Sequence, residues 1–203
     1  MSEGKFIVLE GGEGVGKTTQ ADLLVQKLGE QGRKAEFIRE PGGDPLAERI
    51  RELLLSPELS HEPETELLLF NAARIQTLTI VKDKLDQGID VVSDRNMLST
   101  IAYQGYGRGL DLDLVREVCE IATAKVKPDL LLVLDAPAEV VNSRRDSRGT
   151  TDRFEAAGED FHEKVREGYR KEAARLELPI IDASPDVQAV FDQIWQKVEP
   201  LIN

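Results

Sequence analysis

The segment "EGGEGVGKTTQ", residues 10–20, follows the apolar run "KFIVLE" at residues 5–10 and precedes a helical pattern. Its spacing from Gly11 to Thr18 matches G-x-x-x-x-G-K-[ST], in which a glycine-rich loop between a strand and a helix surrounds phosphate groups. Glycine weakens helices and strands, but it lets the backbone turn so that several N–H groups converge on an anion. A chance glycine turn does not explain the strand–loop–helix order, so the segment predicts a nucleoside triphosphate site.

Two side chains at the end of this loop suit ATP and a metal ion. The helix that begins near Lys17 adds its positive end, Lys17 can reach the β- and γ-phosphates, and the Thr18 hydroxyl can bind Mg²⁺. We find no N-K-x-D element of the kind used for guanine, so ATP is favoured over GTP. The loop residues predicted to bind ATP are Gly11, Gly12, Glu13, Gly14, Val15, Gly16, Lys17, Thr18 and Thr19.

Five short apolar runs are predicted to be strands, and helical patterns lie between them. The runs at 5–10 and 129–135 are almost continuously apolar, which is typical of strands buried on both faces of a parallel sheet. Among the helical patterns is a long one that Pro63 can begin and Gly88 can end. This alternation predicts an α/β sandwich in a single domain over residues 1–203. The predicted strands are residues 5–10, 35–40, 89–94, 129–135 and 178–183.

The composition limits the classes of partner. The chain has 203 residues, with 26 Lys and Arg against 38 Asp and Glu, and a formal net charge of −12. A general binder of nucleic acid or of a membrane surface would carry a basic face, so we expect neither partner. No apolar run approaches the roughly 20 residues of a membrane span, and the N-terminus has no signal-peptide pattern. The single cysteine, Cys119, fits a reducing compartment, and we expect a cytoplasmic protein.

Polar residues follow the second and third predicted strands, at the sheet edge where parallel α/β folds bind ligands. The second strand ends in "REPGG", with Arg39, Glu40 and Pro41, and the third ends in "SDRN". Asp94 closes an apolar strand as a Walker-B-type aspartate does, and Arg95 can hold a phosphate with two hydrogen bonds. An ordinary ion pair at the strand end explains Asp94 and Arg95 equally well.

Two residue pairs four positions apart are candidates for binding an acceptor nucleotide. In "LLLFNAARIQ", Phe70 can stack on a base whose edge Arg74 binds, although a core phenylalanine beside a solvated arginine is the commoner meaning of such a pair. In "LSTIAYQGYGRG", Ser99 and Tyr103 share a helical face beside Gln104. That second pattern is equally typical of a helix end running into a glycine turn.

The segment "RRDSRGTTDRFEAAGED", residues 144–160, is polar and contains Arg144, Arg145, Arg148 and Arg153. We interpret it as a mobile lid whose arginines meet the charge that develops on a transferring phosphoryl group, and whose closure excludes water. A solvated charged loop is the alternative interpretation.

Together these motifs resemble the bacterial thymidylate kinases over essentially the whole chain. The segments that carry the resemblance are "EGGEGVGKTT", "REPGG", "LLLFNAARIQ", "SDRNMLSTIAYQGYGRG", "PDLLLVLDAP" and "DRFE". The glycine loop is shared by many families, whereas "REPGG", "FNAARIQ" and "DR…S…AYQG" in combination are far more specific. The resemblance implies the P-loop nucleoside-monophosphate kinase fold, a three-layer sandwich with a five-stranded parallel sheet. It also implies Mg²⁺-dependent transfer of the ATP γ-phosphate to dTMP in dTTP synthesis.

The matching positions imply roles for individual residues. Phe70 would stack on thymine, Arg74 would bind its carbonyl edge, and Tyr103 would pack under the sugar. Thr18 and Asp94 are the implied metal residues, with Glu40 helping to order Mg²⁺, water or the arginines. The implied dTMP-binding residues are Glu13, Arg39, Pro41, Arg51, Phe70, Arg74, Arg95, Ser99, Tyr103 and Gln104. The implied catalytic residues are Lys17, Arg95, Arg148, Arg153 and Glu13, and Arg144 and Arg145 join the ATP site.

The resemblance extends to a subgroup. Gly14 occupies the loop position where some members carry a catalytic arginine, so the lid is expected to supply that arginine, as Arg153 or Arg148. Asn96 departs from the pattern, because an aromatic residue or histidine commonly follows "DR". The family is commonly homodimeric, and the leucine-rich helix 64–87 can supply an interface or belong wholly to the core.

Two other functions are weighed against a dTMP kinase. One is a kinase for another nucleotide, such as dUMP or a cytidylate, because Phe70, Arg74 and Tyr103 do not by themselves read the thymine methyl group. The other is an ATP-binding regulatory module that transfers nothing. The lid arginines and the acceptor-side cluster argue against this module.

Overall fold

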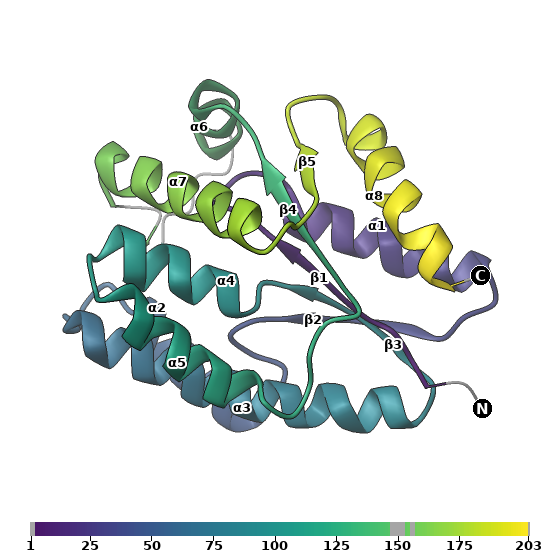
Figure 1. Cartoon of the computed structure of the whole chain (residues 1–203), viewed down its shortest axis with the longest axis horizontal. Coiled ribbons are helices and arrows are strands. Elements are labelled where there is room, and N and C mark those ends of the chain that lie inside the picture. Colours follow the sequence, from purple (N-terminus) through teal and green to yellow (C-terminus); the bar gives the residue numbers. More distant parts are fainter. Residues whose placement is uncertain (1–2, 147–152, 155–156, 203) are drawn as a thin grey trace.

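The computed structural model describes residues 3–146, 153–154 and 157–202 (Figure 1). The elements in chain order are β1 (Phe6–Glu10), α1 (Lys17–Glu30), β2 (Ala35–Arg39), α2 (Pro45–Leu55), α3 (Pro63–Asp86), β3 (Asp90–Asp94), α4 (Met97–Thr100), the π-helix η1 (Ile101–Gly107), α5 (Leu112–Thr123), β4 (Leu130–Asp135), α6 (Ala138–Asp146), α7 (Glu159–Arg175), β5 (Ile180–Asp182) and α8 (Val187–Ile202). The predicted α/β class is confirmed, and all five predicted strands are present with ends shifted by one or two residues.

Within the described residues, five parallel strands form one sheet in the order β2-β3-β1-β4-β5. The first strand therefore lies in the centre, which explains its continuous apolar sequence: every residue from Phe6 to Glu10 is buried. In the register of β1 with β3, Leu9 lies opposite Asp94. The loop after β1 and the "DRN" turn after β3 thus leave the same sheet edge side by side, which is the usual place for a ligand.

Helices cover both faces of the sheet, giving three layers (Figure 1). On one face, Ile7 and Leu9 of β1 pack with buried residues of α1 and α8. On the other face, Phe6 and Val8 pack with α3, and Val133 of β4 packs with α4, η1, α5 and α7. The alternation along β1 follows from the strand period of two, in which successive side chains point to opposite faces.

In the segment after β3, the four residues of α4 continue into η1, a π-helix that contains Gly105 and ends at Gly107. Gly109 follows with a φ of +81°, so a glycine turn does follow the helix, and Ser99, Tyr103 and Gln104 lie within the helix. A Cβ on Gly107 would lie 2.7 Å from the Phe161 ring of α7, and one on Gly168 of α7 would lie 2.7 Å from the Tyr106 ring of η1. Glycine at both positions therefore lets η1 and α7 approach closely.

Among the described residues, no helix is both long enough and apolar enough to span a bilayer. The predicted lid, residues 144–160, runs from the last residues of α6 to the first residues of α7, and only part of it belongs to the described chain.

Candidate active site

The loop after β1 has the backbone geometry that phosphate binding needs. Gly11 has a φ of +144°, and a Cβ on it would lie 2.4 Å from the carbonyl oxygen of Leu134, so a side chain there is excluded. Gly16 precedes α1 with a φ of +95°, and within the described chain no side chain caps this helix end. The first N–H groups and the positive end of α1 are therefore available to an anion.

Lys17 begins α1 and is buried beneath the loop. Its Nζ donates a hydrogen bond to the Gly12 carbonyl oxygen at 2.8 Å and lies 3.9 Å from Asp94 Oδ1. Burial lowers the pKa of the Lys17 ammonium group, and the neighbouring charge of Arg95 lowers it further. The ammonium group has three donors and the Gly12 carbonyl oxygen accepts from one of them, so phosphate oxygens can accept from the others.

Thr18 and Asp94 bring together the oxygen atoms that suit Mg²⁺. The Thr18 hydroxyl donates to Asp94 Oδ2 at 2.6 Å, whereas Asp94 Oδ1 is buried without a hydrogen-bond partner in the described part of the molecule. Residues 3–146, 153–154 and 157–202 contain no group of three or more potential His, Cys, Asp or Glu ligands. This sparse oxygen set fits Mg²⁺, which usually takes one or two protein ligands and completes its shell with phosphate and water.

A cavity of about 280 Å³ adjoins the loop. It is lined at one end by Gly14, Gly16, Lys17 and Thr18, and farther along by residues of α2, α3, α4 and η1. All residues predicted to bind dTMP line this one cavity, namely Glu13, Arg39, Pro41, Arg51, Phe70, Arg74, Arg95, Ser99, Tyr103 and Gln104. The fold therefore gathers positions from five separate sequence segments beside the phosphate loop.

Arg95 projects into this cavity from a strained backbone, with a φ of +84° that residues other than glycine rarely adopt. Its N–H donates to the Leu9 carbonyl at 2.9 Å, which ties the turn to β1. Its guanidinium donates to Glu13 Oε1 at 2.5 Å and to the hydroxyls of Ser99 and Tyr169 at 3.0 and 3.2 Å. Arg95 is thus an oriented cation in the cavity wall, suited to a phosphate.

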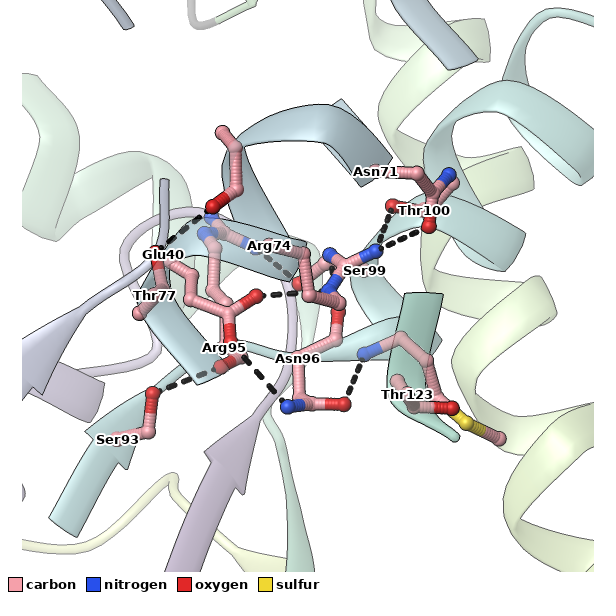
Figure 2. Close-up of polar contacts among 12 residues, drawn as sticks. Glu40, Asn71, Arg74, Thr77, Ser93, Arg95, Asn96, Ser99, Thr100 and Thr123 are labelled. Atoms are coloured by element: carbon pink, nitrogen blue, oxygen red, sulfur yellow. Dashed lines mark hydrogen bonds and ion pairs between the residues drawn. The ribbon is translucent and has the colours of Figure 1, made fainter. Parts of the chain in front are cut away.

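Arg74 is buried, so the alternative of a solvated arginine is wrong. Its Nε donates to Glu40 Oε2 at 2.7 Å, and its two Nη atoms donate to Asn71, to the Thr100 hydroxyl and to the Asn96 carbonyl (Figure 2). Four of the five donors of the guanidinium are used by these bonds. Among the described residues the second Nη2 hydrogen has no acceptor, so it can bind a ligand in the cavity that Arg74 lines.

Glu40 and Asn96 support Arg74 from the β2 and β3 ends. Asn96 is fully buried, and its Nδ2 donates to Glu40 Oε1 at 3.2 Å. Burial raises the pKa of the Glu40 carboxyl to about 7, although the charge of Arg74 opposes this. The asparagine that departs from the family pattern therefore has a place in this structure as a donor to a buried carboxyl.

Aromatic rings form the far end of the cavity. Phe70 and Tyr103 both line it, and both contact Phe154, with ring centroids 5.7 and 5.8 Å away. Burial raises the pKa of the Tyr103 hydroxyl, which donates to Glu13 at 3.0 Å. The flat base of a nucleotide can therefore lie against these rings while the phosphate of the same nucleotide faces Arg95.

Two further arginines lie at the cavity rim. Arg39 is half-exposed and pairs with Glu48 at 3.1 Å, while Arg51 donates to the Pro41 carbonyl oxygen at 3.1 Å. Both side chains line the cavity, so they add positive charge to its wall.

Two of the four lid arginines have described side chains, Arg144 and Arg153, and these two have different partners. Arg144 donates to the carbonyl oxygens of Ala183 and Pro185 at 2.8 and 3.2 Å, beside the β5–α8 connection. Arg153 pairs with Glu66 at 2.8 Å, and this partner is in α3, outside the phosphate loop. Arg148 and the side chain of Arg145 lie outside the described residues.

Sequence reasoning missed several buried residues at this site, among them Glu10, Glu66 and Phe154. Glu10, at the end of β1, accepts hydrogen bonds from the Asn96 and Ser99 amides. Glu66 accepts from Gln104 at 3.1 Å, and Phe154 lines the cavity. A signal existed for Glu66, because it lies four residues before Phe70 and thus shares its helix face. The other two depend on contacts distant in the sequence.

Comparisons with known proteins agree with this geometry. The family model described as thymidylate kinase matches residues 9–194, which include the loop, the cavity residues and the lid. The chain belongs to the thymidylate kinase family. The thymidylate kinase (dTMP kinase) activity and the use of ATP that the sequence predicts are thereby confirmed.

Full-length relatives give the same result. The thymidylate kinase of Carboxydothermus hydrogenoformans is 43% identical over 199 residues, covering 98% of both chains. That of Ectopseudomonas mendocina is 47% identical over 200 residues, covering 94% of both, and that of Pseudomonas putida strain GB-1 is 44% identical over 191 residues, covering 92% of this chain and 91% of the relative.

Proposed function

We propose that the phosphate loop holds ATP, that the adjoining cavity holds dTMP, and that Mg²⁺ bound through Thr18 and Asp94 assists the transfer. The observation that carries this proposal is the single cavity lined by both Lys17 and Phe70. A phosphate at Lys17 and a base at Phe70 would belong to two nucleotides that meet end to end. The outcome is dTDP and ADP.

The residues act mainly by positioning and by charge. Lys17, the loop N–H groups and α1 bind the donor phosphates, while Arg95 holds the acceptor phosphate in line with them. The acceptor phosphate is already anionic at neutral pH, so no strong general base is required. Mg²⁺, when bound, neutralises charge on the donor phosphates. Glu13 keeps Arg95 in place through their ion pair.

The arginine that meets the transferring phosphate is proposed to come from the lid, residues 144–160. Arg148 is the preferred candidate, because Arg153 already pairs with Glu66, near the aromatic end of the cavity that is proposed to hold the thymine base. Arg144 and Arg145 are assigned to the adenine end of the ATP site, in keeping with the contact of Arg144 with the Ala183 carbonyl.

At the level of the whole protein, we propose one cytoplasmic kinase domain over residues 1–203 that forms a homodimer. Exposed leucine and isoleucine side chains on α2, α3 and α5 support the dimer: Leu46, Leu53, Leu68, Leu114 and Ile121. Burying these side chains against a second copy would remove apolar surface from water.

The test is a coupled ADP-release assay with dTMP, dUMP, dCMP and dGMP as acceptors. We expect dTMP to have the highest kcat/KM and turnover to require Mg²⁺. A preference for dCMP would support the other-nucleotide kinase, and ATP binding without dTDP would support the regulatory module. Either result would overturn the proposal.

A further inference from the structure

Glu66 is a buried carboxylate that binds both the cavity wall and the lid. It lies on α3 with 1% of its surface exposed. Its Oε2 accepts a hydrogen bond from Gln104 Nε2 at 3.1 Å, and both carboxylate oxygens accept from Arg108 at 3.1 Å. Arg153 pairs with Oε1 at 2.8 Å. Two guanidinium groups therefore compensate the buried charge while a neutral amide takes one further acceptor position.

The bond from Gln104 to Glu66 decides which way the Gln104 amide faces. An amide has donors on nitrogen and acceptors on oxygen, and Glu66 can only accept when ionised. The nitrogen must therefore face Glu66, and the oxygen is left toward the cavity that Gln104 lines. In the part of the chain that the structure describes, no hydrogen bond is made by this oxygen.

The adjacent cavity wall has the opposite polarity. The Arg74 guanidinium carries only donors. Its hydrogen bonds to Glu40, Asn71, Thr100 and Asn96 use four of the five, and the second Nη2 hydrogen has no acceptor among the described residues. The pocket thus offers one donor and one acceptor. The imide edge of thymine or uracil presents a carbonyl beside an N3–H and matches this pair, whereas cytosine presents an amino group beside an unprotonated N3 and opposes both.

We propose that Glu66 is a specificity-determining positioning residue, which selects an imide base by holding the Gln104 oxygen toward the acceptor. The inference rests on the proposed function, because it assumes that the base lies in this cavity. It attributes the rejection of dCMP to a residue that does not touch the nucleotide. It also predicts that the pair does not distinguish dTMP from dUMP.

The first test is Glu66→Gln, assayed for kcat and KM with dTMP, dUMP and dCMP. The new side-chain amide at position 66 has one oxygen, and Arg108 and Arg153 both need it as an acceptor. The new amide nitrogen therefore faces Gln104, and the Gln104 amide must turn over to offer its oxygen to that nitrogen. We expect the kcat/KM ratio of dTMP to dCMP to fall at least about tenfold. The KM for dTMP should rise about as much, with kcat within about twofold.

The matched control is Glu172→Gln. Glu172 is equally buried and pairs with Arg116 and Arg175, but it is not among the residues that line the cavity. This variant should lose stability without a change in the dTMP to dCMP ratio. An unchanged ratio in Glu66→Gln, or an equal change in Glu172→Gln, would overturn the inference.

Gln104→Met keeps the inference testable should Glu66→Gln fail to fold. It removes the Gln104 amide, which is proposed to bind the base, and leaves the ion pairs of Arg108 and Arg153 with Glu66 intact. It should lower the ratio less than Glu66→Gln does, because methionine removes the acceptor without presenting a donor to the base, and adding Glu66→Gln to it should lower the ratio no further. If wild-type protein fails to phosphorylate dTMP, the proposed function fails; if it does so and the ratios stay fixed, only this inference fails.

Discussion

Glu13 in the phosphate loop and Arg95 after β3 form an ion pair, with 2.5 Å between Glu13 Oε1 and Arg95 Nη2. Burial raises the pKa of the Glu13 carboxyl, but the charges of Arg95 and Lys17 outweigh this effect and the pKa falls to about 2. The donor loop and the acceptor cation are therefore held by one charged contact. Its removal should affect the acceptor more than the donor.

We expect Glu13→Gln to raise the KM for dTMP about tenfold and to leave the KM for ATP within about twofold. The reason is that a hydrogen bond to a charged group contributes roughly 1.5–3 kcal/mol, and without it Arg95 is less well oriented. Steady-state kinetics with each substrate varied in turn give both constants. An unchanged KM for dTMP would contradict the assigned role of the pair.

Lys17→Ala should lower kcat at least about a hundredfold, because it removes a preorganised positive charge from the donor phosphates. Binding of dTMP, measured by calorimetry without ATP, should stay the same. Lys27→Ala is the control on the same helix: Lys27 is partly exposed, pairs with Glu30 and does not line the cavity. Comparable losses in both variants would mean that α1 stability, and not the charge of Lys17, sets the rate.

The sequence was sufficient for the strands and for the polar residues at their ends. A strand buried on both faces must be apolar throughout, and the loop after it must contain glycine where a Cβ would strike Leu134. Both requirements are local, so they are visible in the order of residues. The register of β1 with β3 then brings Asp94 beside the loop without any further information.

Contacts between distant segments could not be predicted in this way. Arg74 is buried because Glu40, 34 positions earlier, offers it a carboxylate, and helix periodicity carries no information about that partner. The pairing of Arg153 with Glu66 depends likewise on the approach of the lid to α3. Lid arginines look alike in sequence, and only their partners distinguish a phosphate ligand from an anchor.

Arg74→Ala should destabilise the protein and weaken dTMP binding together. Truncation leaves the buried Glu40 without its positively charged partner, which typically costs about 3–5 kcal/mol, and removes the donor to the base. Urea unfolding and the KM for dTMP measure the two effects. Arg33→Ala is the control, because it breaks the pair with buried Asp90 outside the cavity. It should reduce stability alone; a stable Arg74→Ala variant with normal KM would refute both roles.

Substitutions of the two lid arginines, Arg153 and Arg148, should have different kinetic effects. Arg153→Ala is expected to raise the KM for dTMP several-fold with little change in kcat, because its partners Glu66 and Phe154 lie at the base end of the cavity. Arg148→Ala, which rests on the sequence pattern alone, should lower kcat about a hundredfold or more with a small change in KM. Single-turnover kinetics would distinguish the two, and a larger kcat loss in Arg153→Ala would reverse the assignment.

Glu40 should give the protein a measurable pH dependence of stability. Burial raises its pKa from 4.5 to about 7, so between these values the folded protein holds a proton that the unfolded chain has released. Stability should therefore fall as pH rises from about 4.5 to 7, by on the order of 3 kcal/mol, and level off above. Glu40→Gln, which imitates the protonated carboxyl, should abolish this fall.

Urea unfolding at intervals between pH 4 and 8.5 measures the difference between the two proteins. Glu48→Gln is the control: the Gly43 N–H and then the charge of Arg39 lower the pKa of the Glu48 carboxyl, so its contribution is lost only as pH falls below 4.5. Removing the Glu48 carboxyl should change the pH dependence of stability below pH 4.5 and leave the fall in stability between pH 4.5 and 7 unchanged. Parallel wild-type and Glu40→Gln profiles across that interval would show that Glu40 stays ionised beside Arg74.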